Sequence, residues 1–312
     1  MRGVARGRGG AVAMVATVVA HVATAVACAK APPLPPPPDG MVAIPAGPVA
    51  AFHLDRTEVT NAAFAQFVAA TGYRTQAERP VDWEQLRREL PPGTPRPPDA
   101  ELAAGALVFA PTAAPVSLDD ERQWWRWTPG ASWRHPEGPG SELAGREDHP
   151  VVQVSHTDAE AFCAWAGKRL PTDAEWEHAA RGGLDDKRFT WGDAPITPAL
   201  ANTWQGTFPV RDLAGDGHAG TASVGRYPAN GYGLADMAGN VWEWTASEAA
   251  PDQRVIRGGS FLCHESYCEG YRVAARMSAT PSTALQHTGF RCAAPPGLPA
   301  TSPAPGAPAA RP

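Results

Sequence analysis

HPVVQVSHTDAEAFCAWAGKRLPTDAEWEHAARGG, residues 149–183, contains the start and stop signals of two consecutive helices. In the first, the residues TDAE at 157–160 have the spacing of a capping box, and Gly167 is a suitable end. The same four letters recur at 172–175, and the second helix is expected to end at Gly182. The stretch therefore predicts two short helices in succession.

A third helix is predicted nearer the N-terminus, at residues 61–71. Its apolar side chains Phe64, Phe67 and Val68 recur at helical spacing, and Gly72 follows as the stop signal. Such a pattern is typical of a helix that packs one face against a core.

The second half of the chain looks irregular. Residues 191–294 consist mostly of short apolar stretches interrupted by Gly, Asn, Asp and Pro. The 312 residues include 31 Gly and 34 Pro, a composition that favours loops over long helices. A domain with so much irregular backbone must satisfy its amides through side chains, water or ions, and calcium is suited to that role.

The two ends of the chain differ in composition from its middle. Residues 1–28 have a basic head, an apolar run and small residues before Cys28, as in an export signal or a lipoprotein signal. A Pro-rich linker follows at 29–40, and a disordered Pro/Ala-rich tail is expected at 295–312. The simplest interpretation of 41–294 is one domain. We expect an exported protein, periplasmic or extracellular, tethered to a membrane only if Cys28 is lipidated or the signal is kept as an anchor.

The charged residues give no sign of a nucleic-acid partner. The net charge of −5 comes from 27 basic and 32 acidic side chains, and neither sign forms a long run after the N-terminus. The aromatic residues are unevenly spread, and four Trp crowd together: Trp124, Trp125, Trp127 and Trp133. We favour core packing for this cluster over an aromatic wall that faces a ligand.

Four cysteines remain beyond the export segment: Cys163, Cys263, Cys268 and Cys292. An oxidising compartment permits disulfides, and four cysteines can pair in three ways. In RGGSFLCHESYC, residues 257–268, the spacing lets both sulfurs reach one centre. A local disulfide, a zinc site that also uses His264, and a two-thiolate site for Cu(I) are the alternatives.

Several segments together resemble a known family, the formylglycine-generating enzymes or sulfatase-modifying factors. These segments are EVTNAAFAQFVAATGY (58–73), GASWRHPEGP (130–139), the two-helix stretch (149–183), ANTWQGTFPV (201–210), NGYGLADMAGNVWEW (230–244) and RVIRGGSFLCHESYCEGYRVAARMSATPSTALQHTGFRCA (254–293). KRLPTDAEWE and GNVWEW mark only the superfamily, whereas the cysteine segment and RHPEGP are more specific to the oxidases.

The resemblance implies an α+β fold, a single irregular, loop-rich domain distantly related to C-type lectins. It also implies a monomeric oxidase that converts the cysteine of Cys-X-Pro-X-Arg in unfolded sulfatase chains to Cα-formylglycine, using O2 and a thiol reductant. Cys263 and Cys268 would bind Cu(I). Ser260 would lie near the oxygen and substrate pocket, where the alternative is a turn hydroxyl, and Trp242 would lie beside the active site, where the alternative is core packing.

Structural calcium is implied by the same resemblance. In the first set, the ligands are the side chains of Asn202 and Asp216 and the backbone carbonyls of Thr203 and His218. In the second set, they are the side chains of Asp236 and Glu243 and the backbone carbonyls of Gly239 and Val241. A disulfide between Cys163 and Cys292 is also implied, and a loop of that length would contribute roughly 4–5 kcal/mol. The positions of a second family bridge are Ala180 and Val273, so that bridge is absent.

Some features depart from the family pattern. The first hairpin is shortened, the loop between Trp244 and Arg254 is brief, and Glu265 stands where a basic residue is frequent. One rival hypothesis is a non-catalytic exported binding or scaffold module of the same superfamily, although such members generally lack the cysteine pair. The other is a sulfoxide-synthase-type enzyme, which needs a histidine cluster that this sequence does not show near its N-terminus.

Overall fold

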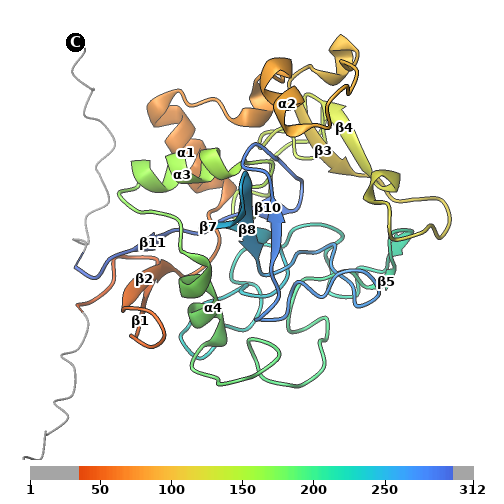
Figure 1. Ribbon diagram of the computed structural model, residues 1–312. Coiled ribbons are helices and arrows are strands. Elements are labelled where there is room, and N and C mark those ends of the chain that lie inside the picture. Colours follow the sequence, from red (N-terminus) through yellow and green to blue (C-terminus); the bar gives the residue numbers. More distant parts are fainter. Residues whose placement is uncertain (1–34, 298–312) are drawn as a thin grey trace, which may run out of the picture. The chain divides into compact units, whose positions relative to one another are not determined.

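The computed structural model describes residues 35–297 (Figure 1). The export or lipoprotein signal, the first part of the linker and nearly all of the tail lie outside these residues, as does Cys28. Within the described part, no helix combines the length and the apolar character that a membrane span requires.

The two-helix stretch folds into α3 (His156–Trp165) and α4 (Asp173–Arg181). The start of α4 is confirmed, because Thr172 and Glu175 form the predicted capping box, and Gly182 with φ 58° closes the helix. The predicted start of α3 is wrong. Its cap is Ser155, whose hydroxyl accepts the Asp158 N–H at 3.2 Å while the Asp158 carboxylate accepts the Ser155 N–H at 2.8 Å.

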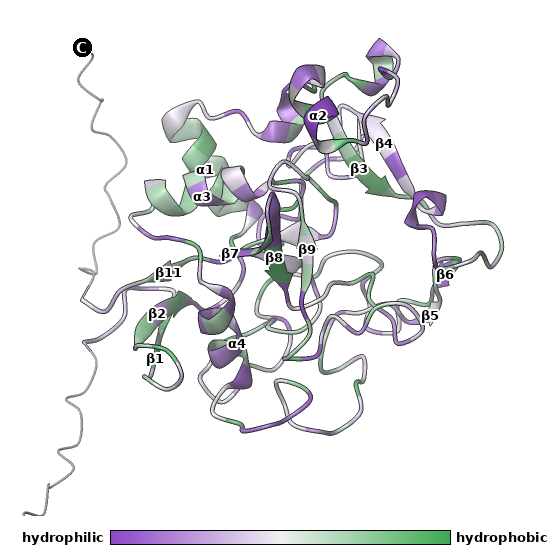
Figure 2. Cartoon of the chain, viewed as in Figure 1, coloured by the Kyte–Doolittle hydropathy of each residue, from purple (hydrophilic) through white to green (hydrophobic). Residues whose placement is uncertain are grey.

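The third predicted helix is confirmed as α1 (Asn61–Thr71), with Phe64, Phe67 and Val68 buried and Gly72 in the left-handed region. Further short helices were not predicted: α2 (Trp83–Glu89), η1 (Gln76–Glu78), η2 (Asp99–Glu101) and η3 (Glu121–Gln123). Figure 2 shows that α1 is mainly hydrophobic and α2 mainly hydrophilic, which agrees with the apolar face of α1 packing inward.

The strands form small separate sheets rather than one large one. One sheet has the order β1 (Met41–Ile44), β2 (Phe52–Asp55), β11 (Ala293–Ala294). Another has the order β10 (Thr288–Gly289), β7 (Trp242–Ala250), β8 (Gln253–Arg257), β9 (Met277–Ala279). Two hairpins complete the set: β3 (Gly105–Phe109) with β4 (Trp125–Pro129), and β5 (Gly206–Thr207) with β6 (Arg211–Asp212). The fold is thus α+β and loop-rich, with the nine-residue β7 as an exception to the expected lack of long elements.

The main core is aromatic and joins distant parts of the chain. Phe64 of α1 contacts Trp133 at 5.2 Å between ring centroids, Phe162 of α3 at 5.8 Å and Phe290 at 6.4 Å. The disulfide between Cys163 and Cys292 lies in the same cluster and joins residues 129 apart in sequence, the pairing that the resemblance implied. The core therefore ties the helices to the C-terminal strands.

A buried arginine connects the loops around this core. Arg291, with a fully buried side chain, donates to both carboxylate oxygens of Glu243 at 2.7 Å. It also donates to the carbonyl oxygens of Ala235 at 3.0 Å and Arg56 at 3.1 Å. One guanidinium thus joins β7, the end of β2 and the loop before β7 to the C-terminal segment.

Replacement of this arginine is expected to be severe. Arg291→Met would leave Glu243 buried without its partner, which typically costs about 3–5 kcal/mol. Urea unfolding followed by fluorescence would measure the loss. The control is Arg87→Met, which breaks an exposed pair with Glu84 and should change stability by about 0–1 kcal/mol. Equal effects of the two substitutions would contradict the role assigned to Arg291.

A second prediction concerns Glu58, which is buried 3.9 Å from Arg291. Burial, and then the nearby Asp236, raise the pKa of Glu58 well above its ordinary value of 4.5. The folded state therefore holds the Glu58 proton more tightly than the unfolded state does. The resulting stabilisation is complete below pH 4.5 and is lost as the pH rises through the raised pKa.

Glu58→Gln should accordingly raise Tm at pH 8 in chelator-treated buffer, and the gain should shrink as the pH is lowered to 5. Each kcal/mol gained corresponds to about 2–4 °C. Glu175→Gln is a control of opposite sign, because burial raises the pKa of Glu175 but the hydrogen bond from Arg169 brings it below 4.5. A Glu58→Gln gain that is the same at both pH values would rule out ionisation as its cause.

Candidate active site

The cysteine segment starts where β8 ends, at a backbone crossing that requires glycine. Gly259 has φ 72°, and a Cβ there would lie 2.5 Å from the backbone nitrogen of Tyr271. Gly270 lies against the same crossing, where a Cβ would lie 2.3 Å from the ring of Trp242. The two ends of the cysteine loop are therefore held together by direct backbone contact, with Trp242 packed over them.

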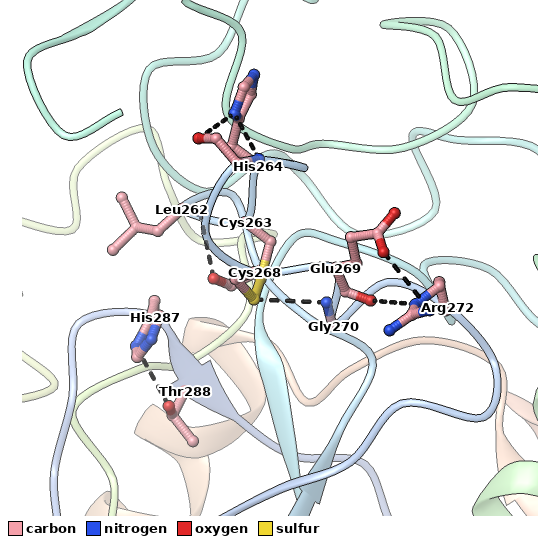
Figure 3. Close-up of a disulfide and its surroundings, with 11 residues drawn as sticks. Leu262, Cys263, His264, Cys268, Glu269, Gly270, Arg272, His287 and Thr288 are labelled. Carbon is pink, nitrogen blue, oxygen red and sulfur yellow. Dashed lines mark hydrogen bonds and ion pairs between the residues drawn. A yellow bond between two sulfur atoms is a disulfide. The ribbon is translucent and has the colours of Figure 1, made fainter. Parts of the chain in front are cut away.

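Between these glycines a tight turn brings the two cysteines together. The N–H of Cys263 donates to the Ser260 carbonyl at 2.9 Å, and the N–H of Cys268 donates to the His264 carbonyl at 2.7 Å. The Cα atoms of Cys263 and Cys268 lie 4.8 Å apart and their sulfurs are joined in a disulfide (Figure 3). The Cys268 sulfur also accepts the N–H of Gly270 at 3.4 Å.

The surroundings of Cys263 and Cys268 can be compared with the three alternatives for this pair: a local disulfide, a zinc site and a two-thiolate copper site. The structure has the sulfurs in the local-disulfide form, which is interconvertible with two adjacent thiolates by reduction. His264 Nδ1 is engaged by the hydroxyl of Ser266 at 2.9 Å and by the Ser266 N–H at 3.2 Å. Residues 35–297 contain no group of three or more His, Cys, Asp or Glu side chains arranged to hold a metal. The zinc alternative thus has no supporting ligand set in that range.

A cavity of about 280 Å³ opens over the cysteine pair. Its polar and sulfur-bearing lining residues include Ser260, Cys263, Cys268 and His287. Its aromatic lining residues are Trp124, Trp125, Phe208, Trp242 and Tyr267. The structure therefore brings all four residues predicted for catalysis, Ser260, Trp242 and the two cysteines, into one cavity.

The aromatic wall of this cavity is rigid by packing. The rings of Phe208 and Tyr267 stack at 4.8 Å with 6° between their planes, and Trp124 meets both edge-on at 5.4 and 5.2 Å. Trp133 instead lies in the main core, as expected of the Trp cluster. The core interpretation is confirmed for Trp133 and also for Trp124, which is buried in a second apolar cluster with Trp204 and Phe208. Trp124 and Trp125 line the cavity as well.

For Ser260 and Trp242, the sequence left a structural role and a place at the active site as alternatives, and the structure combines the two. Ser260 is fully buried, and its hydroxyl accepts the N–H of Leu262 at 3.2 Å, as a turn hydroxyl does. Ser260 also lines the cavity beside the sulfurs. Trp242 is buried in the main core and reaches the same cavity. Ser260 and Trp242 therefore each have a structural role and also line the cavity.

The first predicted calcium set lies at the loop after residue 200. The Asn202 amide nitrogen donates to the Gly220 carbonyl at 2.9 Å and to Asn240 Oδ1 at 3.1 Å, while Asn202 Oδ1 is buried without a partner. Asp216 accepts the N–H of His218 at 2.9 Å and the hydroxyl of Tyr227 at 3.1 Å. The two remaining ligands are the backbone carbonyls of Thr203 and His218, and that of Thr203 accepts from the side-chain amide of Gln205 at 3.2 Å.

The second predicted set lies beside the buried arginine. One oxygen of Asp236 accepts the N–H of Gly225, and the other is buried without a partner. Burial is the main reason that the pKa of Asp236 is raised. Both oxygens of Glu243 are already engaged by Arg291, and one also accepts the indole N–H of Trp176 at 2.8 Å. Gly239 and Val241 lie in the loop between these two carboxylates.

Three residues of these sites were not found from the sequence: Glu58, Arg291 and His287. Glu58 and Arg291 stand in the motifs EVTN and GFRC, where nothing local shows that both side chains are buried together. His287 is an isolated histidine without a spacing pattern. A buried charge with no local partner in sequence is the signal that could have drawn attention to Glu58 and Arg291.

Comparison with known proteins identifies the group to which the chain is similar. Residues 31–295 match the model of the sulfatase-modifying factor enzyme 1-like domain. A formylglycine-generating enzyme of Mycobacterium tuberculosis is 50% identical over 274 residues, covering 80% of this chain and 89% of that protein. The Bos taurus formylglycine-generating enzyme is 42% identical, covering 83% and 76%. The Mus musculus protein named inactive C-alpha-formylglycine-generating enzyme 2 is 40% identical, covering 80% and 76%. With a family match across nearly all of its described residues, and relatives at this level of identity, the chain belongs to the sulfatase-modifying factor enzyme 1-like family.

Proposed function

We propose that this chain is an oxidase that converts the cysteine of the Cys-X-Pro-X-Arg motif in sulfatases to Cα-formylglycine. The observation that carries the proposal is the pairing of Cys263 and Cys268 at an aromatic cavity that also holds Ser260 and Trp242. The family includes relatives named as active and as inactive. The cysteine pair at the cavity, together with relatives named formylglycine-generating enzyme at 42–50% identity, supports an enzyme over a non-catalytic module.

The electron balance of this reaction explains why a reductant is needed. Conversion of the cysteine thiol group and water to an aldehyde and hydrogen sulfide releases two electrons and two protons. Reduction of O2 to two water molecules takes four electrons and four protons. An external thiol reductant supplies the remaining two electrons and two protons as it is oxidised to a disulfide.

Cu(I) fits the donor set. Soft thiolate ligands select this ion, and reduction of the disulfide would release two adjacent thiolates from Cys263 and Cys268. When bound, the ion supplies the one-electron chemistry that O2 requires and an affinity for the substrate sulfur. The N–H of Gly270 directed at the Cys268 sulfur would stabilise negative charge there.

The protein's own contribution is to orient the substrate and to exclude water. The stacked Phe208 and Tyr267 rings and the edge of Trp124 form an apolar wall beside the sulfurs. Ser260, already fixed by the Leu262 N–H, retains its hydroxyl proton to donate to a polar atom in the cavity. Aromatic walls of this kind suit an extended peptide with one side chain inserted.

Aerobic conversion of a peptide containing Leu-Cys-Thr-Pro-Ser-Arg by the Cu(I)-loaded protein tests the proposal, with mass spectrometry to detect the aldehyde. Cys263→Ala and Cys268→Ala should each reduce conversion by more than about 100-fold, since loss of a ligand exceeds the 10–100-fold effect of outer-shell partners. Ser266→Ala changes an exposed residue of the same loop and should stay near wild type. Conversion by Cys263→Ala at the wild-type rate would refute the mechanism.

We also propose that calcium binds at the two predicted sets, and that at the second it binds Asp236 and the loop carbonyls while both oxygens of Glu243 stay with Arg291. The support is one buried, unpartnered oxygen in each, Asn202 Oδ1 and Asp236 Oδ1, next to carboxylates and loop carbonyls that are the usual ligands of this ion. Bound calcium would stabilise irregular backbone that has few sheet or helix hydrogen bonds. No step of the oxidation involves it.

Calcium at 100 times its Kd should stabilise the fold by about 2.7 kcal/mol per site, measurable as a rise in Tm. Asp236→Asn should abolish the share of the calcium-dependent rise in Tm that comes from the second site. Asp193→Asn, which removes an exposed carboxylate paired with Lys187, is the matched control and should leave the rise unchanged. The calcium assignment fails if chelator and excess calcium give the same Tm.

Export to an oxidising compartment belongs to the same proposal. The N-terminal composition supports it, and so does the core disulfide between Cys163 and Cys292, because such bonds persist mainly outside the cytosol. The mature protein would then be periplasmic or extracellular, either free or tethered through Cys28.

A further inference from the structure

His287 is an ionisable side chain in the wall of the active-site cavity. Figure 3 shows His264 and His287 on opposite sides of the cysteine pair. His264 is engaged by Ser266 and lines another pocket, in which Cys263 is present but Cys268 is not. His287 lines the same cavity as both sulfurs and the Ser260 hydroxyl. His287 therefore shares a cavity with both cysteine sulfurs, and His264 does not.

The backbone at His287 is fixed by the sheet. Its carbonyl accepts the N–H of Trp242 at 2.9 Å, and the next residue, Thr288, pairs with Trp242 in the parallel contact between β10 and β7. The imidazole lies against the ring of Trp125, 4.9 Å between centroids. The strand pairing therefore sets His287 and Trp242 side by side at one end of the cavity.

The two ring nitrogens have different surroundings. Nδ1 lies 3.4 Å from the Thr288 hydroxyl, which leaves Nε2 available to the cavity that the half-buried ring lines. In the tautomer whose Nδ1–H donates to Thr288, Nε2 is an acceptor with a free lone pair. A ligand in the cavity that brings its own donor can therefore bond to Nε2.

The ring is neutral when it meets a ligand. Burial lowers the pKa of His287 to about 3, so the imidazolium form is absent at physiological pH. Among the described residues, Glu121 is the one charged side chain that lines the cavity. A neutral acceptor among aromatic rings suits an uncharged donor such as a thiol.

We propose that His287 is a further catalytic residue, whose Nε2 accepts a hydrogen bond from the S–H of the substrate cysteine and orients this thiol toward the Cys263 and Cys268 sulfurs. The inference rests on the function proposed above. The proton stays on sulfur in this contact, so no bond is broken, and the step precedes binding of the substrate sulfur to the metal. The role of His287 is thus to position the sulfur of the substrate cysteine.

A double-mutant cycle tests the contact directly. Binding of the hexapeptide Leu-Cys-Thr-Pro-Ser-Arg and of its Leu-Ala-Thr-Pro-Ser-Arg counterpart would be measured by calorimetry. The protein is the reduced, metal-free full chain in oxygen-free buffer that contains a phosphine reductant. His287→Leu removes the acceptor, and His287→Gln keeps a polar group near the position of Nε2.

His287→Leu should weaken binding of the cysteine peptide by about 3–10-fold, the size of one net hydrogen bond, and leave the alanine peptide within about 2-fold. His287→Gln should recover most of the loss. Equal weakening of both peptides by His287→Leu, no weakening of either, or failure of Gln to recover binding would each overturn the contact.

Two further readouts separate a contact with the thiol from a structural or metal-binding role of His287. The unfolding midpoint and the Cu(I) affinity of His287→Leu, the latter by competition with a chelator, should equal those of wild type. A weaker Cu(I) affinity would make His287 a metal ligand and would overturn the proposal. Wild-type protein that binds neither peptide and converts none refutes the proposed function itself, whereas conversion without any coupling between His287 and the thiol refutes only this contact.

Discussion

The buried ion pair between Arg291 and Glu243 is the interaction on which the arrangement of the loops depends. A chain with small sheets and short helices has few backbone ladders to fix one segment against another. Arg291 replaces them with a planar group whose donors reach a carboxylate and carbonyl oxygens of separate segments. Because Glu243 follows Trp242 and Arg291 precedes Cys292, the same pair holds the cavity wall and the core disulfide in register.

The parts of the fold that could be predicted from the sequence are those decided locally. The boundaries of α1 and α4 follow from an apolar face, a capping box and a terminal glycine. The start of α3 could not be decided in this way, because SHTD and TDAE overlap and both satisfy the capping pattern. Asp158 settles the choice through tertiary contacts, since its carboxylate also accepts from the Tyr73 hydroxyl at 3.0 Å and the Gln76 N–H at 3.1 Å.

The residues of the candidate site can also be divided into those that the sequence predicts and those that only the tertiary structure brings together. Cys263 and Cys268 could be paired from the sequence because five positions separate them, and Ser260 and Trp242 came with the family motifs. His287 could not, because a parallel pairing of two-residue β10 with β7 brings it beside Trp242. The Trp cluster shows the same limit, since Trp133 and Trp124 are both buried core residues and sequence spacing does not show that Trp124 also lines the cavity.

The charges around Arg291 also account for how the fold could accommodate calcium. Glu58, Asp236 and Glu243 are buried near one guanidinium, so full ionisation leaves two negative charges in excess. Without a cation, the protein meets this cost by raising the pKa of Glu58 and of Asp236, so that both retain protons more readily. One divalent cation at the unpartnered Asp236 oxygen would balance the excess and favour the ionised carboxylates. Arg291 already donates hydrogen bonds to both oxygens of Glu243, so the cation would bind next to this ion pair. It would add a second link between the loops that Arg291 joins.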